Sequence, residues 1–242
     1  MRTFRALNDL FSEVTDGEVR VRIEQPEGTR GSLKWIQHLV DRHPASLDES
    51  LREAGALSLV NHLTWLSPLR IDNWAEYRDS QFLHKISQAH LSEELTKFWP
   101  RRGPQWDALA KDESGRIFLF EAKAYGAEMS STCAAGATSL RLINTSLESS
   151  KLAFCATPGA DWISGYYQYA NRLAHLHFLQ KHGVDARLVF LYFVGDGEMN
   201  GPASEAEWKP YIDAAHAHLG ISERTHGAVA IFQDVRGKSS ER

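Results

Sequence analysis

The stretch that decides the fold is Pro104–Lys123, PQWDALAKDESGRIFLFEAK. It contains two short, largely apolar runs, Gln105–Ala110 and Arg116–Ala124. The polar segment between them, Lys111–Gly115, ends in glycine and predicts the turn of a β-hairpin. Ile117–Phe120 is apolar at every position. We therefore expect the second strand of this hairpin to be buried on both faces.

Charged residues interrupt these apolar runs: Asp107 in the first, and Glu121 and Lys123 at the far end of the second. Residues two apart on a strand share a face, so Glu121 and Lys123 should point the same way and Ala122 the other way. The hairpin can bring Asp107 beside them. Because burying unpaired charge costs several kcal/mol, these charges require a compensating role.

The residue types suit metal-assisted phosphate chemistry. Two carboxylates, Asp107 and Glu121, supply the hard oxygen ligands that Mg²⁺ or Mn²⁺ prefers. Such an ion lowers the pKa of a bound water and stabilises charge on a phosphate. Lys123 can orient that water and neutralise the growing negative charge. The pattern predicts a metal-dependent nuclease-type site.

Upstream of the hairpin the chain is polar and helical in pattern. Ser46–Glu49 can cap a helix, Asn73–Gln88 carries apolar residues at three- and four-residue steps, and Leu91–Phe98 predicts a short helix before Pro100.

Downstream of the hairpin we expect an ambiguous helix near Ser139–Ser149, a helix over Ile163–His182 ended by Gly183, a strand Arg187–Val194, a helix Ser204–Leu219 and a strand Gly227–Val235. This order predicts an α/β domain with a mixed sheet and helices on its faces.

Asp107 followed after a gap by Glu121-x-Lys123 resembles the motif of the PD-(D/E)xK phosphodiesterase superfamily of restriction-type endonucleases, resolvases and repair nucleases. The resemblance covers roughly Asn73–Val194 and implies a restriction-endonuclease-like fold: a helix, a three-stranded meander, a crossover helix and a fourth strand. It departs from the motif at Trp106, where proline is usual. The whole chain also resembles an uncharacterised family of bacterial proteins.

The resemblance also implies further site residues. Superfamily members often add an acidic residue from the preceding helix, for which we choose Glu76, with Glu93 and Glu94 as alternatives. Glu76 is explained equally well as an exposed partner in an i,i+4 pair. On the crossover helix, Gln168 is the candidate for contact near the phosphate. It shares a stripe with Arg172, and the alternative is a solvated face.

A basic segment lies just upstream of Asp107. It contains Lys97, Arg101 and Arg102 among Phe98, Trp99 and Trp106. Interleaved cations and aromatics suit phosphate contact and base stacking. A charged loop beside a core aromatic cluster is an equal explanation.

Two other patterns are weaker indications of a metal site. His175/His177 and His216/His218 are spaced i,i+2, which places each pair on different helix faces and favours structural or surface roles. The segment Asp196–Gly201 with Glu207 partly matches a calcium-loop spacing. It follows a predicted strand rather than a helix, however, and Ser204 with Glu207 also reads as a capping box.

Bulk properties place the chain among ordinary globular proteins. It has 242 residues, 43% hydrophobic content and a net charge of −4, which argues against coating nucleic acid through a global field. Met1–Arg22 has no continuous apolar segment, and the two cysteines are far apart. We expect a cytoplasmic protein with no membrane segment.

We expect a single domain: an N-terminal elaboration to about residue 70, a nuclease-like core over 73–194, and a C-terminal helix and strand over 195–242. Three functions fit: a Mg²⁺-dependent nuclease acting on nucleic acid, possible as a homodimer because cutting two strands needs two sites; a non-catalytic nucleic-acid or protein interaction module; or an unrelated α/β enzyme. The last would require a deep, mainly apolar pocket away from the hairpin.

Overall fold

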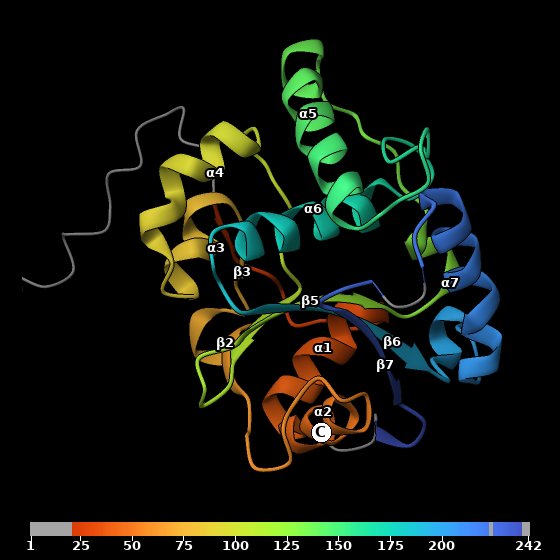
Figure 1. Ribbon diagram of the computed structural model, residues 1–242. Helices are drawn as coiled ribbons and strands as arrows, with labels where there is room; N and C mark the ends of the chain where they lie inside the picture. The colour runs from red at the N-terminus through yellow and green to blue at the C-terminus, as the bar shows by residue number, and fades with distance from the viewer. Residues whose placement is uncertain (1–20, 223–224, 239–242) are drawn as a thin grey trace, which may run out of the picture.

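The computed structural model in Figure 1 describes residues 21–222 and 225–238. We expect Met1–Arg22 to be neither a signal peptide nor an anchor. Residues 1–20 of this segment lie outside the described ranges. Among the helices described, none combines the length and the apolar character needed to cross a membrane.

The centre of the molecule is a five-stranded mixed sheet with the strand order β2-β4-β5-β6-β7. The strands are β2 (Thr64–Ser67), β4 (Ala108–Lys111), β5 (Ile117–Lys123), β6 (Ala186–Val194) and β7 (Ala228–Asp234). Strand β4 runs antiparallel to β2 and to β5, whereas β6 is parallel to β5 and β7 is parallel to β6. The mixed α/β architecture predicted from the order of elements is therefore confirmed.

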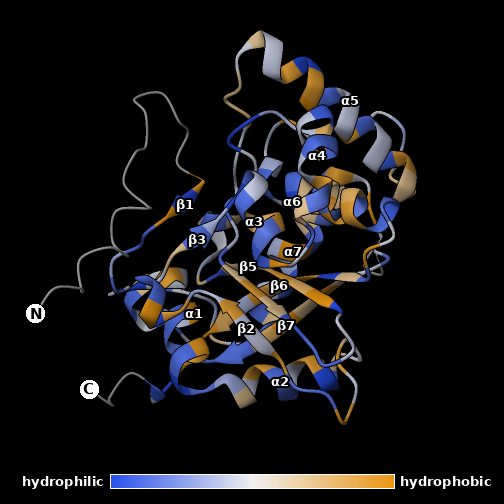
Figure 2. Ribbon diagram, turned by 90° about the vertical axis from the view of Figure 1, so that its left-hand side faces the viewer, coloured by the Kyte–Doolittle hydropathy of each residue, from blue (hydrophilic) through white to orange (hydrophobic). Residues whose placement is uncertain are grey.

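Helices cover both faces of this sheet, seven α-helices in the described ranges (Figure 1). On one face lie α1 (Gly31–Arg42) and α2 (Pro44–Glu53); on the other lie α3 (Asp79–Lys85), α4 (Ser92–Phe98), α5 (Ala137–Ala153), α6 (Tyr167–Lys181) and α7 (Glu205–Leu219). Figure 2 shows the apolar strands enclosed between these two layers.

The β4–β5 hairpin forms where the sequence predicts it, with Ala108 paired to Phe120. Its turn is held by Asp112, whose Oδ1 accepts hydrogen bonds from the backbone N–H groups of Ser114 and Arg116 at 2.9 and 3.0 Å. Gly115 takes a left-handed conformation with φ of 85°, which glycine adopts without steric cost. Local turn chemistry therefore sets the register of the two strands.

Strand β5 is buried along Ile117–Ala122, as expected for an apolar run inside a sheet. Phe118, Phe120 and Ala122 pack with α1 and α2, whereas Ile117 and Leu119 pack on the opposite face. Glu121 and Lys123 continue the second series, so both side chains face α6.

The single helix predicted over Asn73–Gln88 is wrong. Asn73 and Trp74 have left-handed backbones, and Glu76–Tyr77 forms a strand, β3, which pairs with β1 (Arg22–Ile23). Only α3, Asp79–Lys85, is helical. A contact across about fifty residues of sequence therefore overrides the helical periodicity of this segment.

Two helix starts also differ from expectation. The first is α2, which begins at Pro44, a residue whose missing N–H costs nothing at the first helical position. Ser46 consequently lies inside the first turn and donates to the His43 carbonyl instead of capping. Helix α6 begins at Tyr167 rather than Ile163, because Asp161 Oδ1 accepts the N–H groups of the next residues in a turn.

The other downstream elements follow the prediction closely, including the Ser204 cap of α7, whose side chain accepts the N–H of Glu207. The sheet nevertheless takes strands from all three expected segments of the chain. Strand β2 comes from the N-terminal segment and β7 from the C-terminal one. Neither segment is a mere addition to the central hairpin.

Candidate functional site

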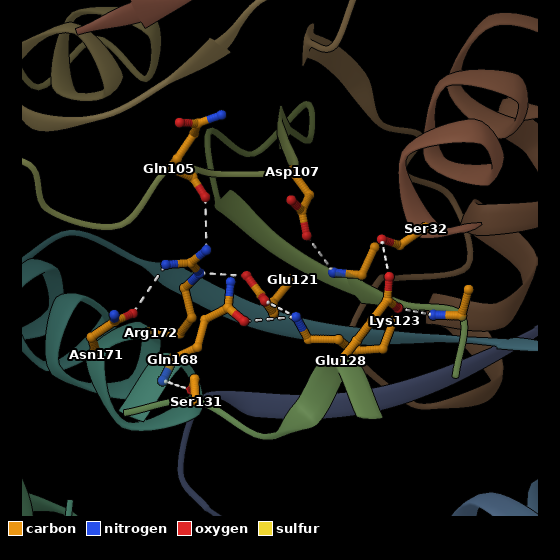
Figure 3. A network of polar contacts seen from close by, with 12 residues as sticks. Ser32, Gln105, Asp107, Glu121, Lys123, Glu128, Ser131, Gln168, Asn171 and Arg172 are labelled. Carbon is orange, nitrogen blue, oxygen red and sulfur yellow. Dashed lines mark hydrogen bonds and ion pairs between the residues drawn. The ribbon is translucent and has the colours of Figure 1, made fainter. Parts of the chain in front are cut away.

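The charged end of β5 faces the first two turns of α6 (Figure 3). Lys123 Nζ lies 2.6 Å from Glu121 Oε1 and donates a hydrogen bond of 2.9 Å to Gln168 Oε1. The Glu121 side chain is only 1% exposed, whereas Lys123 retains 12% exposure. Glu121 and Lys123 thus lie on one face as predicted, and the structure places Gln168 beside them.

Asp107 immediately precedes β4 and is the next residue opposite Glu121 in the hairpin register. Its Oδ2 accepts the backbone N–H of Ala122 at 2.7 Å. Asp107 as a whole residue is half-buried, whereas Glu121 is buried. The hairpin therefore brings both predicted carboxylates to the same end of β5.

Glu76 joins the cluster from β3, not from a helix as expected. It is 5% exposed, and its Oε2 accepts hydrogen bonds from the side-chain amides of Gln25, at 3.0 Å, and Gln105. Gln25 follows β1, so the N-terminal segment forms part of the rim of the site. No sequence pattern indicated Gln25, because its place depends on the pairing of β1 with β3.

Arg172 is the main site residue without a predicted role. Its Nε donates to Glu121 Oε2 at 2.5 Å and its Nη2 to the Gln105 carbonyl at 2.7 Å. One signal was available: Arg172 lies four residues after Gln168 and so projects from the same face of α6.

The carboxylates differ in their electrostatic surroundings. Burial, followed by the nearby charges of Glu121 and Glu76, raises the pKa of Asp107 well above its usual range. Burial also raises the pKa of Glu76, although the hydrogen bonds from Gln105 and Gln25 oppose it. For Glu121, burial acts upward, but the charges of Arg172 and Lys123 outweigh it and lower the pKa. The surroundings therefore favour the ionised form of Glu121 and disfavour the ionised form of Asp107.

This donor set fits a divalent cation. Mutual repulsion among carboxylates is what a cation between them relieves, and their oxygens are the ligands that Mg²⁺ prefers. Glu121 Oε1 is buried, and its close contact is the ion pair with the Lys123 ammonium at 2.6 Å. Across residues 21–222 and 225–238, no three acidic, histidine or cysteine side chains form a ready-made cage. Mg²⁺ needs only one or two protein carboxylates, with waters completing its shell.

The alternatives for the third acidic residue lie elsewhere. Glu93 and Glu94 are exposed on α4 and pair with Lys97. The aromatics of that segment do not form a stacking surface: Trp99 and Trp106 are buried in the core around His175. Of the two interpretations of this segment, the burial of Trp99 and Trp106 supports the charged loop beside a core aromatic cluster.

The residues of the calcium-loop pattern do not form a common site in the structure. Asp196 accepts a hydrogen bond from Trp35 Nε1 at 2.8 Å, Glu198 pairs with Lys34, and Glu207 accepts the N–H of Ala203. These carboxylates are engaged at separate places and do not converge.

A surface hollow of about 660 Å³ lies beside α1 and shares no lining residue with the carboxylate cluster. Its lining is mostly charged and polar, and its charges pair locally, as Arg70 does with Asp41 at 3.1 Å. It does not have the apolar walls of a typical small-molecule site.

Comparison of the chain with protein-family models, curated proteins and solved structures found no match. The functional assignment therefore depends on the residues and geometry of the site itself.

Proposed function

We propose that the protein is a metal-dependent phosphodiesterase that hydrolyses nucleic acid. One observation carries this proposal. Asp107 immediately precedes β4 and accepts the N–H of Ala122 at 2.7 Å, which holds it at the end of β5 that carries Glu121 and Lys123. This arrangement supports the proposal of a D…ExK site.

The strand order supports a restriction-endonuclease-like fold. Three antiparallel strands, β2, β4 and β5, are followed by crossover helices and then by β6, which runs parallel to β5. The PD-(D/E)xK resemblance implies a three-stranded meander, a crossover helix and a fourth strand. Strands β4 and β5, helix α6 and strand β6 agree with this succession, whereas β3, α3 and α4 separate β2 from β4 along the chain. The crossover helix α6 also supplies Gln168 to the end of β5.

Each residue has a distinct task in this proposal. Asp107 and Glu121 hold Mg²⁺ or Mn²⁺, which would stabilise charge on the scissile phosphate and acidify a bound water. Lys123 orients the attacking water through Nζ and balances the negative charge that develops. Gln168 holds Nζ in place through its 2.9 Å hydrogen bond. Glu76 adds a third carboxylate at the rim of the site.

A specific observation keeps a second function in view. Glu121 is already paired with two cations, Lys123 at 2.6 Å and Arg172 at 2.5 Å. Such a triad can be purely structural. The protein would then be a non-catalytic nucleic-acid or protein interaction module on the same fold.

A cleavage assay separates the two functions. Wild type, Asp107→Ala and the control Asp213→Ala, an exposed carboxylate on α7, are incubated with mixed DNA and RNA and Mn²⁺ or Mg²⁺. We expect cleavage by wild type and the control, and loss of cleavage in Asp107→Ala with its thermal unfolding retained. Metal-independent binding without cleavage by wild type would instead establish the interaction module.

A further inference from the structure

The Arg172 guanidinium is only 3% exposed, and each of its nitrogens has a partner. Nε donates to Glu121 Oε2 at 2.5 Å, Nη1 to Asn171 Oδ1 at 3.0 Å, and Nη2 to the Gln105 carbonyl at 2.7 Å. Its Cζ also lies 5.0 Å from the centre of the Trp106 ring. The side chain is thus locked on both its edges and its face, as Figure 3 shows for the polar contacts.

Two of these contacts connect the segments that carry the carboxylates. Gln105 lies two residues before Asp107, and Glu121 belongs to β5. Arg172 comes from a third element, α6. Because a guanidinium is a rigid planar fork, it sets the separation of the two groups that it holds, which a flexible ammonium group cannot do.

Arg172 also distinguishes the two oxygens of Glu121. Oε2 accepts the hydrogen bond from Arg172 Nε, whereas Oε1 is buried and lies 2.6 Å from the Lys123 ammonium. Glu121 lines a small cavity of about 10 Å³ together with Lys123 and Gln168. Because Arg172 holds Oε2, a cation would reach Glu121 through Oε1, in place of the Lys123 ammonium that lies 2.6 Å from it.

We infer that Arg172 is a positioning residue that presents Glu121 to a divalent cation through Oε1 alone and fixes the Gln105–Asp107 segment against it. This inference rests on the proposed function and adds to it the denticity of one ligand and the residue that imposes it. Partners of metal ligands are typically worth about 10- to 100-fold in metal affinity.

The choice of variant matters, because truncating Arg172 leaves the buried Glu121 short of a partner and tests folding instead of positioning. Arg172→Lys keeps the charge and loses the fork. The matched control is Arg187→Lys, since Arg187 is a partly exposed arginine on β6 that pairs with Asp185.

The test is calorimetric titration of Mn²⁺ into wild type and both variants, with thermal unfolding measured without metal. We expect Arg172→Lys to unfold cooperatively near the wild-type temperature and to bind Mn²⁺ about 10-fold or more weakly. Arg187→Lys should bind as wild type does. Loss of metal affinity without matching loss of metal-free stability is the signature of positioning.

The outcomes distinguish the inference from the proposed function. Equal Mn²⁺ affinity in wild type and Arg172→Lys overturns this inference alone. If wild type binds no Mn²⁺, both fall. Should Arg172→Lys fail to fold, a crystal structure of wild type with Mn²⁺ decides: coordination by Glu121 Oε1 alone supports the inference, and coordination by Oε2 overturns it.

Discussion

Replacing Asp107 by asparagine is expected to stabilise the metal-free protein at pH 8 and to abolish its stabilisation by Mn²⁺. In the folded chain, burial and the charges of Glu121 and Glu76 raise the pKa of Asp107 well above its usual range. Asparagine removes the charge and keeps an oxygen that can accept the N–H of Ala122, which Asp107 now accepts at 2.7 Å. The substitution therefore removes repulsion without removing the hydrogen bond.

The sign and size follow from proton linkage. An acid whose folded pKa lies above its unfolded value of about 3.9 destabilises the fold progressively as pH rises between the two values. Above the folded pKa of Asp107 the full penalty applies, about 1.4 kcal/mol for each unit of upward shift. In a chain of this size, each kcal/mol corresponds to about 2–4 °C in unfolding temperature. The asparagine variant should gain this amount at pH 8 and lose its advantage near pH 4.

The assay is thermal unfolding of both proteins at pH 4 and pH 8, with chelator and then with Mn²⁺. At a metal concentration 100 times the Kd, the free energy of unfolding of wild type rises by about 2.7 kcal/mol, whereas that of Asp107→Asn does not change. Metal therefore narrows or reverses the difference in stability between the two proteins. A variant less stable than wild type at pH 8 in chelator would refute the electrostatic reasoning. Equal stabilisation of both proteins by Mn²⁺ would refute the role of Asp107 as a ligand.

Three further substitutions test other parts of the structure. Glu121→Ala leaves two cations without their shared buried partner and should cost about 3–5 kcal/mol in urea unfolding; a loss below 1 kcal/mol would contradict the buried triad. Gly201→Ala would place a methyl group against the Ala124 carbonyl oxygen and should lower the free energy of unfolding by about 1–3 kcal/mol. The control Gly197→Ala, in open space of the same loop, should change it by about 0.5 kcal/mol or less. Equal effects would contradict the close approach of Gly201 to the Ala124 carbonyl. Burial lowers the pKa of His175 from 6.5 to about 3. The free energy of unfolding should therefore fall by about 1.4 kcal/mol for each pH unit as the pH drops between these values. His175→Phe should remove this pH dependence, and an unchanged pH profile of stability in the variant would contradict the buried neutral histidine.

The central hairpin and the later elements were predictable because their signals are local. The burial of β5 on both faces follows from its continuous apolar sequence, and the turn between the strands carries Asp112 and Gly115 where the geometry needs them. The shared face of Glu121 and Lys123 follows from strand periodicity alone.

The rest of the site could not be predicted, because it depends on contacts between distant segments. The periodicity around Glu76 favours a helix, but pairing of β1 with β3 makes it a strand and brings Gln25 to its carboxylate. Arg172 stood in a visible stripe with Gln168, yet its role requires Glu121, 51 residues away. Trp99 and Trp106 were open to two interpretations from the sequence, because aromatics beside basic residues can lie on a binding surface or in the core, and both are buried in the core.

The most direct test of the central claim is calorimetric titration of Mn²⁺ into wild type and Asp107→Ala. If Asp107 and Glu121 form a metal site, wild type binds Mn²⁺ and Asp107→Ala, although folded, does not. Absence of binding in wild type, or equal binding in both proteins, would contradict the metal-dependent function proposed for this site.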